Sequence, residues 1–269
     1  LILGDRTNIR TDLKKAYADA GAVHLLAISG LHIGVLLLIL NGAFGMLLRG
    51  KHKNLIRMIG VVGCLWVFAF ITGLSASVVR SVTMFSALAI GNASNQTLPR
   101  FQTLLISLFI LLLIKPQFIF DVGFQLSYVA VFGIIWLMPV AIKIWKPRTW
   151  IGLKLWQLFA LGIIAQLSVL PLSLFYFHQF PSLFFISNLV IVPFMGLLLS
   201  GGIFVILLAS LDIHVPIIIE NYNFLISCMN HLIQWVAEQE SFIIRHIPFG
   251  FFECVVVFCM VMGVGKWIE

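Results

Sequence analysis

The chain has 269 residues, of which 61% are hydrophobic and only 10% are charged, and its net charge is +7. Soluble domains carry about 25% charged residues, so this composition, with a mean hydropathy of +1.09, excludes an ordinary water-soluble protein. We predict an all-α, polytopic membrane protein that forms a single domain over residues 1–269.

The first 22 residues differ from the rest of the chain. They mix acidic and basic side chains with sparse apolar ones, which predicts an amphipathic helix lying beside the membrane. The chain begins at Leu1 with no initiator methionine and no secretory signal pattern. We therefore expect these residues to be a piece of a longer protein.

Successive apolar runs follow, suited to crossing about 30 Å of hydrocarbon as helices. The predicted spans are 23–48, 55–73, 78–94, 101–115, 123–142, 154–177, 183–210 and 250–267. We expect roughly seven to nine membrane segments in all.

Two short loops hold much of the positive charge. Their basic residues are Arg49, Lys51, Lys53 and Arg57 in the first, and Lys143, Lys146, Arg148 and Lys154 in the second. The positive-inside rule places such loops in the cytoplasm. Four predicted spans separate the loops, and this even number is consistent with both loops lying on one side.

Two of the spans are irregular. The span at 78–94 is short and polar, and the span at 183–210 contains Asn188, Pro193 and a Ser-Gly-Gly sequence. Proline removes a backbone donor, and irregular backbone at membrane depth persists only inside protein or beside water. We expect one or two broken or re-entrant helices here.

Residues 211–246 carry polar side chains every three or four positions, including Glu220, Asn223, Ser227 and Gln234. This spacing predicts an amphipathic interfacial helix. We place it on the outer face of the membrane, which leaves the topology of residues 183–250 open.

The apolar run beginning at Val23 contains His24, Ser29 and His32. Ionisable groups at membrane depth usually face protein or water. His32 therefore has either a functional role or a role in helix packing. Gly30 and Gly34 form a small-xxx-small pattern, which favours close helix packing.

Arg80 is the most informative single residue, because a guanidinium near membrane depth must pair or face water. Its candidate partners are Asp121, a helix C-terminus or a ligand phosphate. Capping of a helix explains Asp121 well, whereas Gln125 and Ser127 are less easily assigned to structure.

Further polar or helix-bending residues are Gln166 and Pro171 in one span, and Asn188 and Pro193 in another. Each alone fits an interhelical hydrogen bond or a kink. Together they predict a shared polar interior. No nucleotide-binding, hydrolase or metal-ligand motif is present, so we expect no enzyme activity, no cofactor and no metal.

The segment from His24 to Gly34, His-Leu-Leu-Ala-Ile-Ser-Gly-Leu-His-Ile-Gly, resembles the signature of the ComEC-type competence proteins. Other similar elements follow in order across nearly the whole chain. They are Ser77-Val-Val-Arg80, Asp121-Val-Gly-Phe-Gln-Leu-Ser127, and the stretch from Pro171 to Pro193 through Phe180-Pro181 and Asn188, with Leu3-Gly-Asp-Arg6 at the start.

This resemblance implies a channel in the bacterial cytoplasmic membrane that passes single-stranded DNA inward during natural transformation. It also implies DNA-receptor and cytoplasmic DNA-handling competence proteins as partners. Relatives often carry an oligonucleotide-binding domain and a metallo-β-lactamase-like domain, and these 269 residues match neither. A small-solute secondary transporter is the alternative, because broken helices at mid-membrane favour it. A metal-dependent enzyme using His24, His32 and Asp121 ranks last.

Overall fold

The computed structural model describes residues 12–13, 16–17, 20, 29–48, 53–93, 99–181, 184–213, 215–239, 243–245 and 247–268. Nine α-helices, one 3₁₀ helix and two short strands lie within them. They are α2 (Gly30–Leu47), α3 (Lys53–Ile71), α4 (Ala76–Ala93), α5 (Arg100–Ile114), η2 (Pro116–Phe120), α6 (Val122–Ile144), α7 (Trp150–Phe177), β1 (Gln179–Pro181), α8 (Phe184–Ser210), α9 (Pro216–Ala237), β2 (Ile243–Arg245) and α10 (Phe251–Ile268).

The all-α fold class is confirmed, and each predicted span corresponds to one helix. The number of membrane segments is not confirmed. Four helices, α2, α3, α6 and α7, are long and apolar enough to cross a membrane. Among the residues whose side chains the structure describes, shorter apolar helical stretches cover 76–91, 100–114, 194–210 and 251–263, and the last two are parts of α8 and α10.

The prediction of broken helices at 78–94 and 183–210 is wrong. Each segment is one continuous helix, α4 and α8 respectively, and α8 continues through Pro193. A proline in a helix interior removes one hydrogen bond and favours a kink, and the long apolar sequence on both sides of Pro193 keeps the helix intact. Pro171 likewise lies inside the continuous helix α7.

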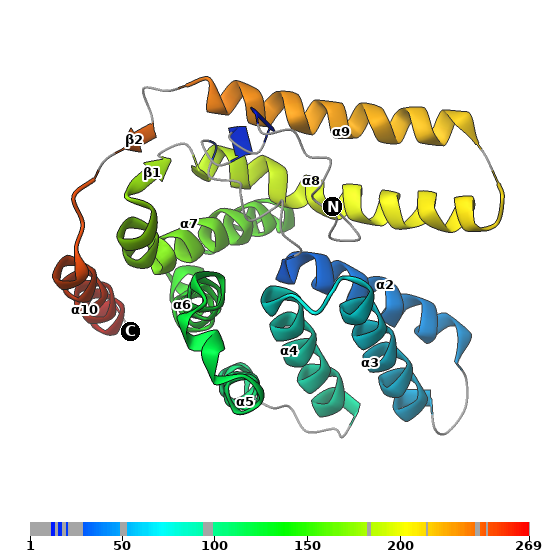
Figure 1. Ribbon diagram of the computed structural model, residues 1–269, viewed down its shortest axis with the longest axis horizontal. Helices are drawn as coiled ribbons and strands as arrows, with labels where there is room; N and C mark the ends of the chain where they lie inside the picture. The colour runs from blue at the N-terminus through cyan, green and yellow to red at the C-terminus, as the bar shows by residue number, and fades with distance from the viewer. Residues whose placement is uncertain are drawn as a thin grey trace.

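The helices pack in three groups. Helices α2, α3 and α4 share one apolar core around Ile33, Leu65 and Val82. Helices α4, α5 and α6 share a second core around Leu104, Leu111 and Phe124. Figure 1 shows α5, α6 and α10 nearly end-on, whereas α2, α3 and α4 run across the view.

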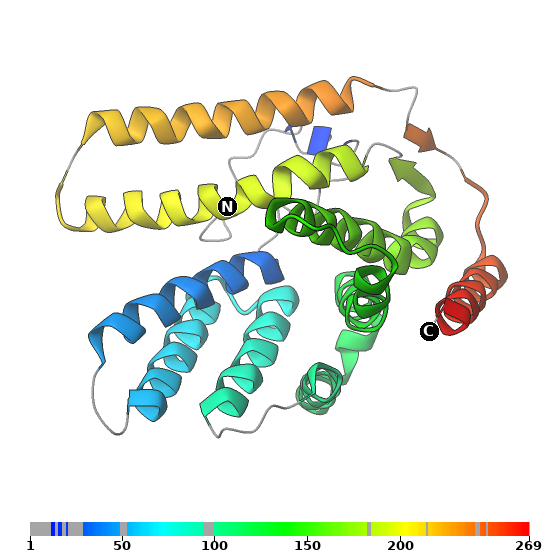
Figure 2. The same ribbon diagram turned by 180° about the vertical axis from the view of Figure 1, so that it is seen from behind.

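Helices α8 and α9 lie side by side along one edge of the molecule, as Figures 1 and 2 both show. Their core includes Ile191, Met195 and Ile233, and it also takes up Tyr17 from the N-terminal segment. The Tyr17 hydroxyl donates a hydrogen bond to Asn230 Oδ1 at 3.0 Å, and burial raises the pKa of Tyr17 to about 12.

The described part of the N-terminal segment therefore packs against α8 and α9. Tyr17 and Ala20 are each only 1% exposed. Sequence reasoning missed this because charged neighbours surround these two residues. The amphipathic helix predicted within 211–246 is present as α9, which buries Met229, Ile233 and Val236 and exposes Glu220, Asn223 and Gln234.

Helices α6 and α7 form a long antiparallel pair joined by a short loop. Asp121 caps α6, and Thr149 caps α7 by accepting a hydrogen bond from the Gly152 amide. The chain then forms a small antiparallel sheet, in which Phe180 of β1 lies opposite Ile244 of β2. This sheet ties the end of α7 to the segment that leads into α10, and α10 packs against α7.

Candidate functional site

Buried polar side chains concentrate on two neighbouring helices. Among the described residues with side chains at most 8% exposed, the polar or charged ones are His32, Arg80, Ser81, Thr83, Ser86, Thr103, Ser107 and Ser168. Six of these eight belong to α4 and α5. Several hydroxyls form a hydrogen bond within their own helix. Thr83 Oγ1, for example, donates to the Val79 carbonyl at 2.8 Å. Such bonds are ordinary in membrane helices, so Arg80 is the exceptional member.

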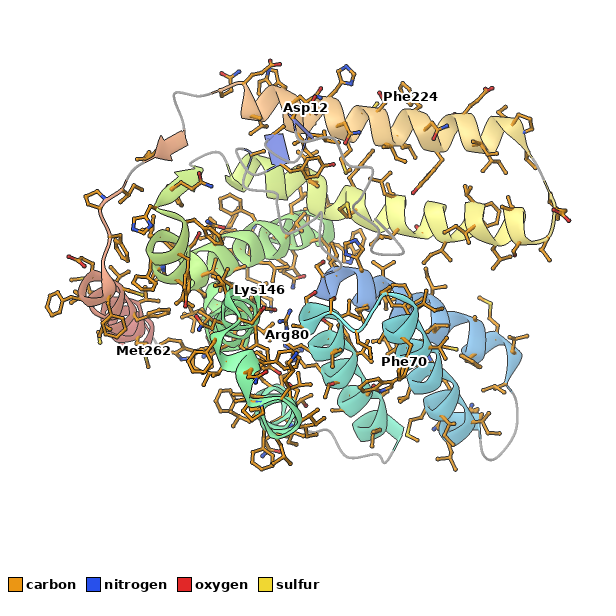
Figure 3. The ribbon with its side chains drawn as sticks, in the orientation of Figure 1. Asp12, Phe70, Arg80, Lys146, Phe224 and Met262 are labelled. Carbon is orange, nitrogen blue, oxygen red and sulfur yellow. The ribbon has the colours of Figure 1, made fainter. Side chains whose placement is uncertain are left out.

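Arg80 lies on α4 and is 4% exposed. Figure 3 shows it between α4 and the end-on α6. Its guanidinium carbon is 5.8 Å from the centre of the Tyr128 ring on α6, which is a cation–π distance. Its Nη1 atom is buried and makes no hydrogen bond to any residue that the structure describes. A guanidinium with a free donor in a protected place is suited to an anionic oxygen.

Tyr128 is held in place from two sides. Its ring centre is 4.6 Å from that of Phe124, one helical turn earlier on α6. Its hydroxyl is 3.1 Å from Ser107 Oγ on α5. Ser107 Oγ uses its one hydrogen to reach the Leu104 carbonyl, so the Tyr128 hydroxyl is the donor to Ser107. Helices α5 and α6 thus position the face of the ring against Arg80 of α4.

Asp121 begins α6, where its carboxylate accepts a hydrogen bond of 2.7 Å from the Phe124 amide. This is the capping role that the sequence suggested. Asp121 also attracts the Arg80 guanidinium electrostatically, although among the described residues the two side chains form no direct ion pair. We call Arg80, Ser107, Asp121 and Tyr128 the Arg80 cluster.

His32 lies near the start of α2 and is 4% exposed. Its Nδ1 atom accepts a hydrogen bond from the Ser29 amide at 3.2 Å and lies 3.0 Å from Ser29 Oγ. These contacts make Ser29 and His32 a cap for the first turn of α2. His24 lies outside the described residues.

Gly30 and Gly34 face α4. A Cβ atom at Gly30 would lie 3.4 Å from Ser81 Oγ, and one at Gly34 would lie 3.6 Å from Phe85 Cζ. Helix α2 therefore approaches α4 closely along this face. Because Ser81 follows Arg80, the start of α2 packs beside the Arg80 cluster.

Gln125 belongs to a different set of contacts. Its Nε2 atom donates to the Ile119 carbonyl at 2.8 Å, and its Oε1 atom accepts from the Tyr176 hydroxyl at 2.9 Å. Ser127 and Gln166 are half-buried on α6 and α7. Asn188 lies in α8, and its side chain is outside what the structure describes. The structure thus brings Arg80 to Tyr128, near the start of α6 that Asp121 caps, and places Gln125 in a separate α6–α7 contact.

Sequence reasoning missed Ser107 and Tyr128 as members of the cluster. The one local signal was the four-residue spacing of Phe124 and Tyr128, which puts both rings on one face of α6. Among the described residues, no group of three or more His, Cys, Asp or Glu side chains is placed to hold a metal ion.

The whole chain, residues 1–269, matches a family model described as Competence protein. It is 32% identical over 246 residues to ComE operon protein 3 of Bacillus subtilis. The aligned region covers 91% of this chain and 30% of that protein. It is 25% identical over 225 residues to the uncharacterised protein YcaI of Escherichia coli. This aligned region covers 81% of this chain and 29% of that protein.

The chain therefore spans about 30% of the length of these two relatives. No solved structure matches it. The agreement of the family model over all 269 residues, together with the ordered motifs and the apolar helices that carry them, shows that this chain belongs to the competence protein family.

Proposed function

We propose that this chain is the membrane-embedded conduit of a DNA-uptake system and that it passes single-stranded DNA into the cytoplasm during natural transformation. Membership of the competence protein family supports the uptake role. In this proposal the protein is a multi-pass component of the bacterial cytoplasmic membrane. It transports DNA and performs no chemistry on it. Its partners are a DNA receptor outside and DNA-handling proteins inside.

The observation that carries the proposal is the burial of the Arg80 guanidinium between helices. Keeping a guanidinium in an apolar interior is costly, and beside its contact with Tyr128 the Nη1 atom has no acceptor among the described residues. A phosphodiester oxygen is an acceptor of the right charge and geometry. One transient cation is also suitable for conduction, because a strand that is bound too tightly does not move.

Arg80 is almost fully buried, so the strand reaches it only when α4 and α6 separate. The Arg80–Tyr128 contact joins these two helices directly. Ser107 on α5 holds the Tyr128 hydroxyl. The proposal therefore includes an opening step in which a DNA phosphate replaces the aromatic ring as the partner of Arg80.

The test uses Arg80→Gln and Arg80→Lys in the bacterium that carries the protein, with internalised and surface-bound DNA measured separately. We expect Arg80→Gln to lower internalised DNA about tenfold or more, the factor typical of one lost charge-assisted hydrogen bond. Surface-bound DNA stays unchanged. Arg80→Lys retains part of the activity, because an ammonium keeps the charge but not the planar fork.

The matched control is Arg57→Gln. Arg57 lies near the start of α3 and donates from Nε to Asn41 Oδ1 at 2.9 Å, so this variant removes one arginine outside the Arg80 cluster. Equal uptake by Arg80→Gln and the wild type, at equal amounts of membrane protein, refutes the role of Arg80. The secondary-transporter alternative loses its main support, because α4 and α8 are continuous helices.

A further inference from the structure

A groove of about 490 Å³ runs between α5, α6 and α10, and none of its described lining residues belongs to the Arg80 cluster. Its walls include Phe101 of α5, Phe132 and Trp136 of α6, and Met262 of α10. The Phe101 and Phe132 rings meet edge to face, with centres 5.7 Å apart. Helix α10 packs on α7. Figure 3 shows Met262 on the side of α10 toward α6.

Among the described residues that line the groove, the charged one is Lys143, in the last turn of α6. The exposed cations Lys146, Arg148 and Lys154 follow within eleven residues. The sequence has no acidic residue between Asp121 and Asp212. The acidic residue on the described part of α10, Glu253, accepts a hydrogen bond from the Gly250 amide at the start of that helix. Among the described residues, the charged end of the groove is thus basic.

Tryptophans mark the same end as a membrane–water interface. Four of the seven tryptophans lie between residues 136 and 156. The Trp145 and Trp156 rings meet at 4.9 Å, and Trp156 Nε1 donates to the Ala141 carbonyl at 3.1 Å. Trp150 is 73% exposed. Tryptophan favours the headgroup level of a bilayer, so Lys143 lies where lipid phosphates are found.

The length of the groove fits one leaflet. Phe132 and Lys143 are eleven residues apart on α6, or about 16 Å at 1.5 Å per residue. Half of a hydrocarbon core of about 30 Å is about 15 Å. An acyl chain that begins at the level of Lys143 therefore ends near Phe132.

We propose that this groove binds an anionic phospholipid. One acyl chain lies between α5, α6 and α10 on the aromatic side chains, and the phosphate contacts Lys143 and the following basic loop. Nucleic acid also binds cations, but an apolar groove that leads directly from Lys143 favours a lipid. This inference is independent of DNA transport.

In the test, the full chain is purified in mild detergent and incubated with an equal mixture of phosphatidylglycerol and phosphatidylcholine that have identical acyl chains. Native mass spectrometry counts the lipids of each kind that remain bound. We expect the wild type to enrich phosphatidylglycerol. Lys143→Gln lowers the bound ratio about fivefold, the contribution typical of one lysine near a charged membrane surface. Lys53→Gln, which removes an exposed lysine of the other basic loop, leaves the ratio unchanged.

A second pair of variants tests the groove itself. Met262→Trp fills the groove at constant charge and lowers the occupancy of both lipids. Met260→Trp is the matched control, because Met260 is exposed on the same helix and does not line the groove. Circular dichroism and gel filtration verify that each variant is folded.

Three results overturn the proposal. The first is a wild type without preference for phosphatidylglycerol. The second is an equal effect of a test variant and its control. The third is a Lys143→Gln variant that binds single-stranded oligonucleotide more weakly and keeps the lipid preference, which assigns the basic loop to DNA instead.

Discussion

At the scale of single residues, the proposed function depends most on the contact between Arg80 and Tyr128. Tyr128 provides both an aromatic face to the guanidinium and a hydroxyl to Ser107. These two contributions can be separated by substitution, since phenylalanine keeps the ring and loses only the hydroxyl.

We expect Tyr128→Phe to lower the free energy of unfolding by about 1 kcal/mol, because Ser107 loses one buried hydrogen bond. Tyr128→Leu costs at least about 2 kcal/mol, because Arg80 also loses the ring that accompanies its charge. Thermal unfolding in detergent measures both changes. Tyr176→Phe is the control, since its hydroxyl bond to Gln125 is exposed. A Tyr128→Leu variant as stable as Tyr128→Phe shows that the ring does not stabilise Arg80.

Asp121 combines a local and a longer-range role. Its carboxylate caps α6 and also attracts Arg80. We expect Asp121→Ala to destabilise the protein by about 1 kcal/mol through loss of the cap. Asp121→Asn keeps a capping oxygen without the charge, so unfolding and DNA uptake measured on both variants separate the roles. If Asn restores stability but not uptake, the charge acts on Arg80. If Asn restores both, Asp121 is a cap alone.

Among the helices, α6 and α7 form the closest pair. A Cβ atom at Gly133 of α6 would overlap Ser168 Oγ and lie 2.6 Å from Ser168 Cβ on α7. Ser168 is 5% exposed and bonded to the Ile164 carbonyl, so it has little freedom to move. This is the close packing of small residues that holds helices together in lipid, where apolar burial contributes little.

Gly133→Ala is therefore expected to destabilise the chain by about 1 to 3 kcal/mol through overpacking. Gly162→Ala on α7 is the matched control, because a Cβ atom there meets nothing within 4 Å. Alanine also favours a helix over glycine by about 1 kcal/mol, so the control is neutral or more stable. Melting temperatures in one detergent compare the two variants. Equal temperatures would show that α6 and α7 tolerate a methyl group at their contact.

Over the whole molecule, large apolar side chains are widely exposed. Leu38 is 73% exposed, Phe109 68% and Leu113 71%. A water-soluble protein rarely presents so much apolar surface, whereas lipid is a suitable solvent for it. How many helices cross the membrane is a separate question, since four of the helices in the described residues meet the length and composition of a span.

The positive-inside rule predicts that Lys53 and Lys146 lie on the cytoplasmic side, and we expect Glu220 of α9 outside. Single cysteines at these positions, in a variant without the four native cysteines, test this with a membrane-impermeant maleimide. In intact cells we expect labelling at Glu220→Cys alone, and after permeabilisation at all three. Opposite sides for Lys53→Cys and Lys146→Cys would mean an odd number of crossings between them, which contradicts the four predicted spans.

The helices of this protein could be placed from local sequence alone. Apolar runs, the Asp121 and Thr149 caps and the polar stripe of α9 all act within a few residues, so α2 to α10 lie close to their predicted ranges. The same local reasoning overestimated how strongly Pro193 and the polar residues of α4 interrupt their helices. A single proline or hydroxyl does not end a helix whose other backbone hydrogen bonds are intact.

Packing between distant residues required the fold. Tyr17 bonds Asn230 over a separation of 213 residues, and Arg80 meets Tyr128 from another helix. Helices that are apolar on nearly every side have no single face that marks the neighbour. Their partners are chosen by shape, small residues and a few polar bonds, which exist only when the helices come together. Sequence could therefore single out Arg80 as a charge in need of a partner, while its aromatic partner and the lipid groove beside α6 emerged from the three-dimensional arrangement.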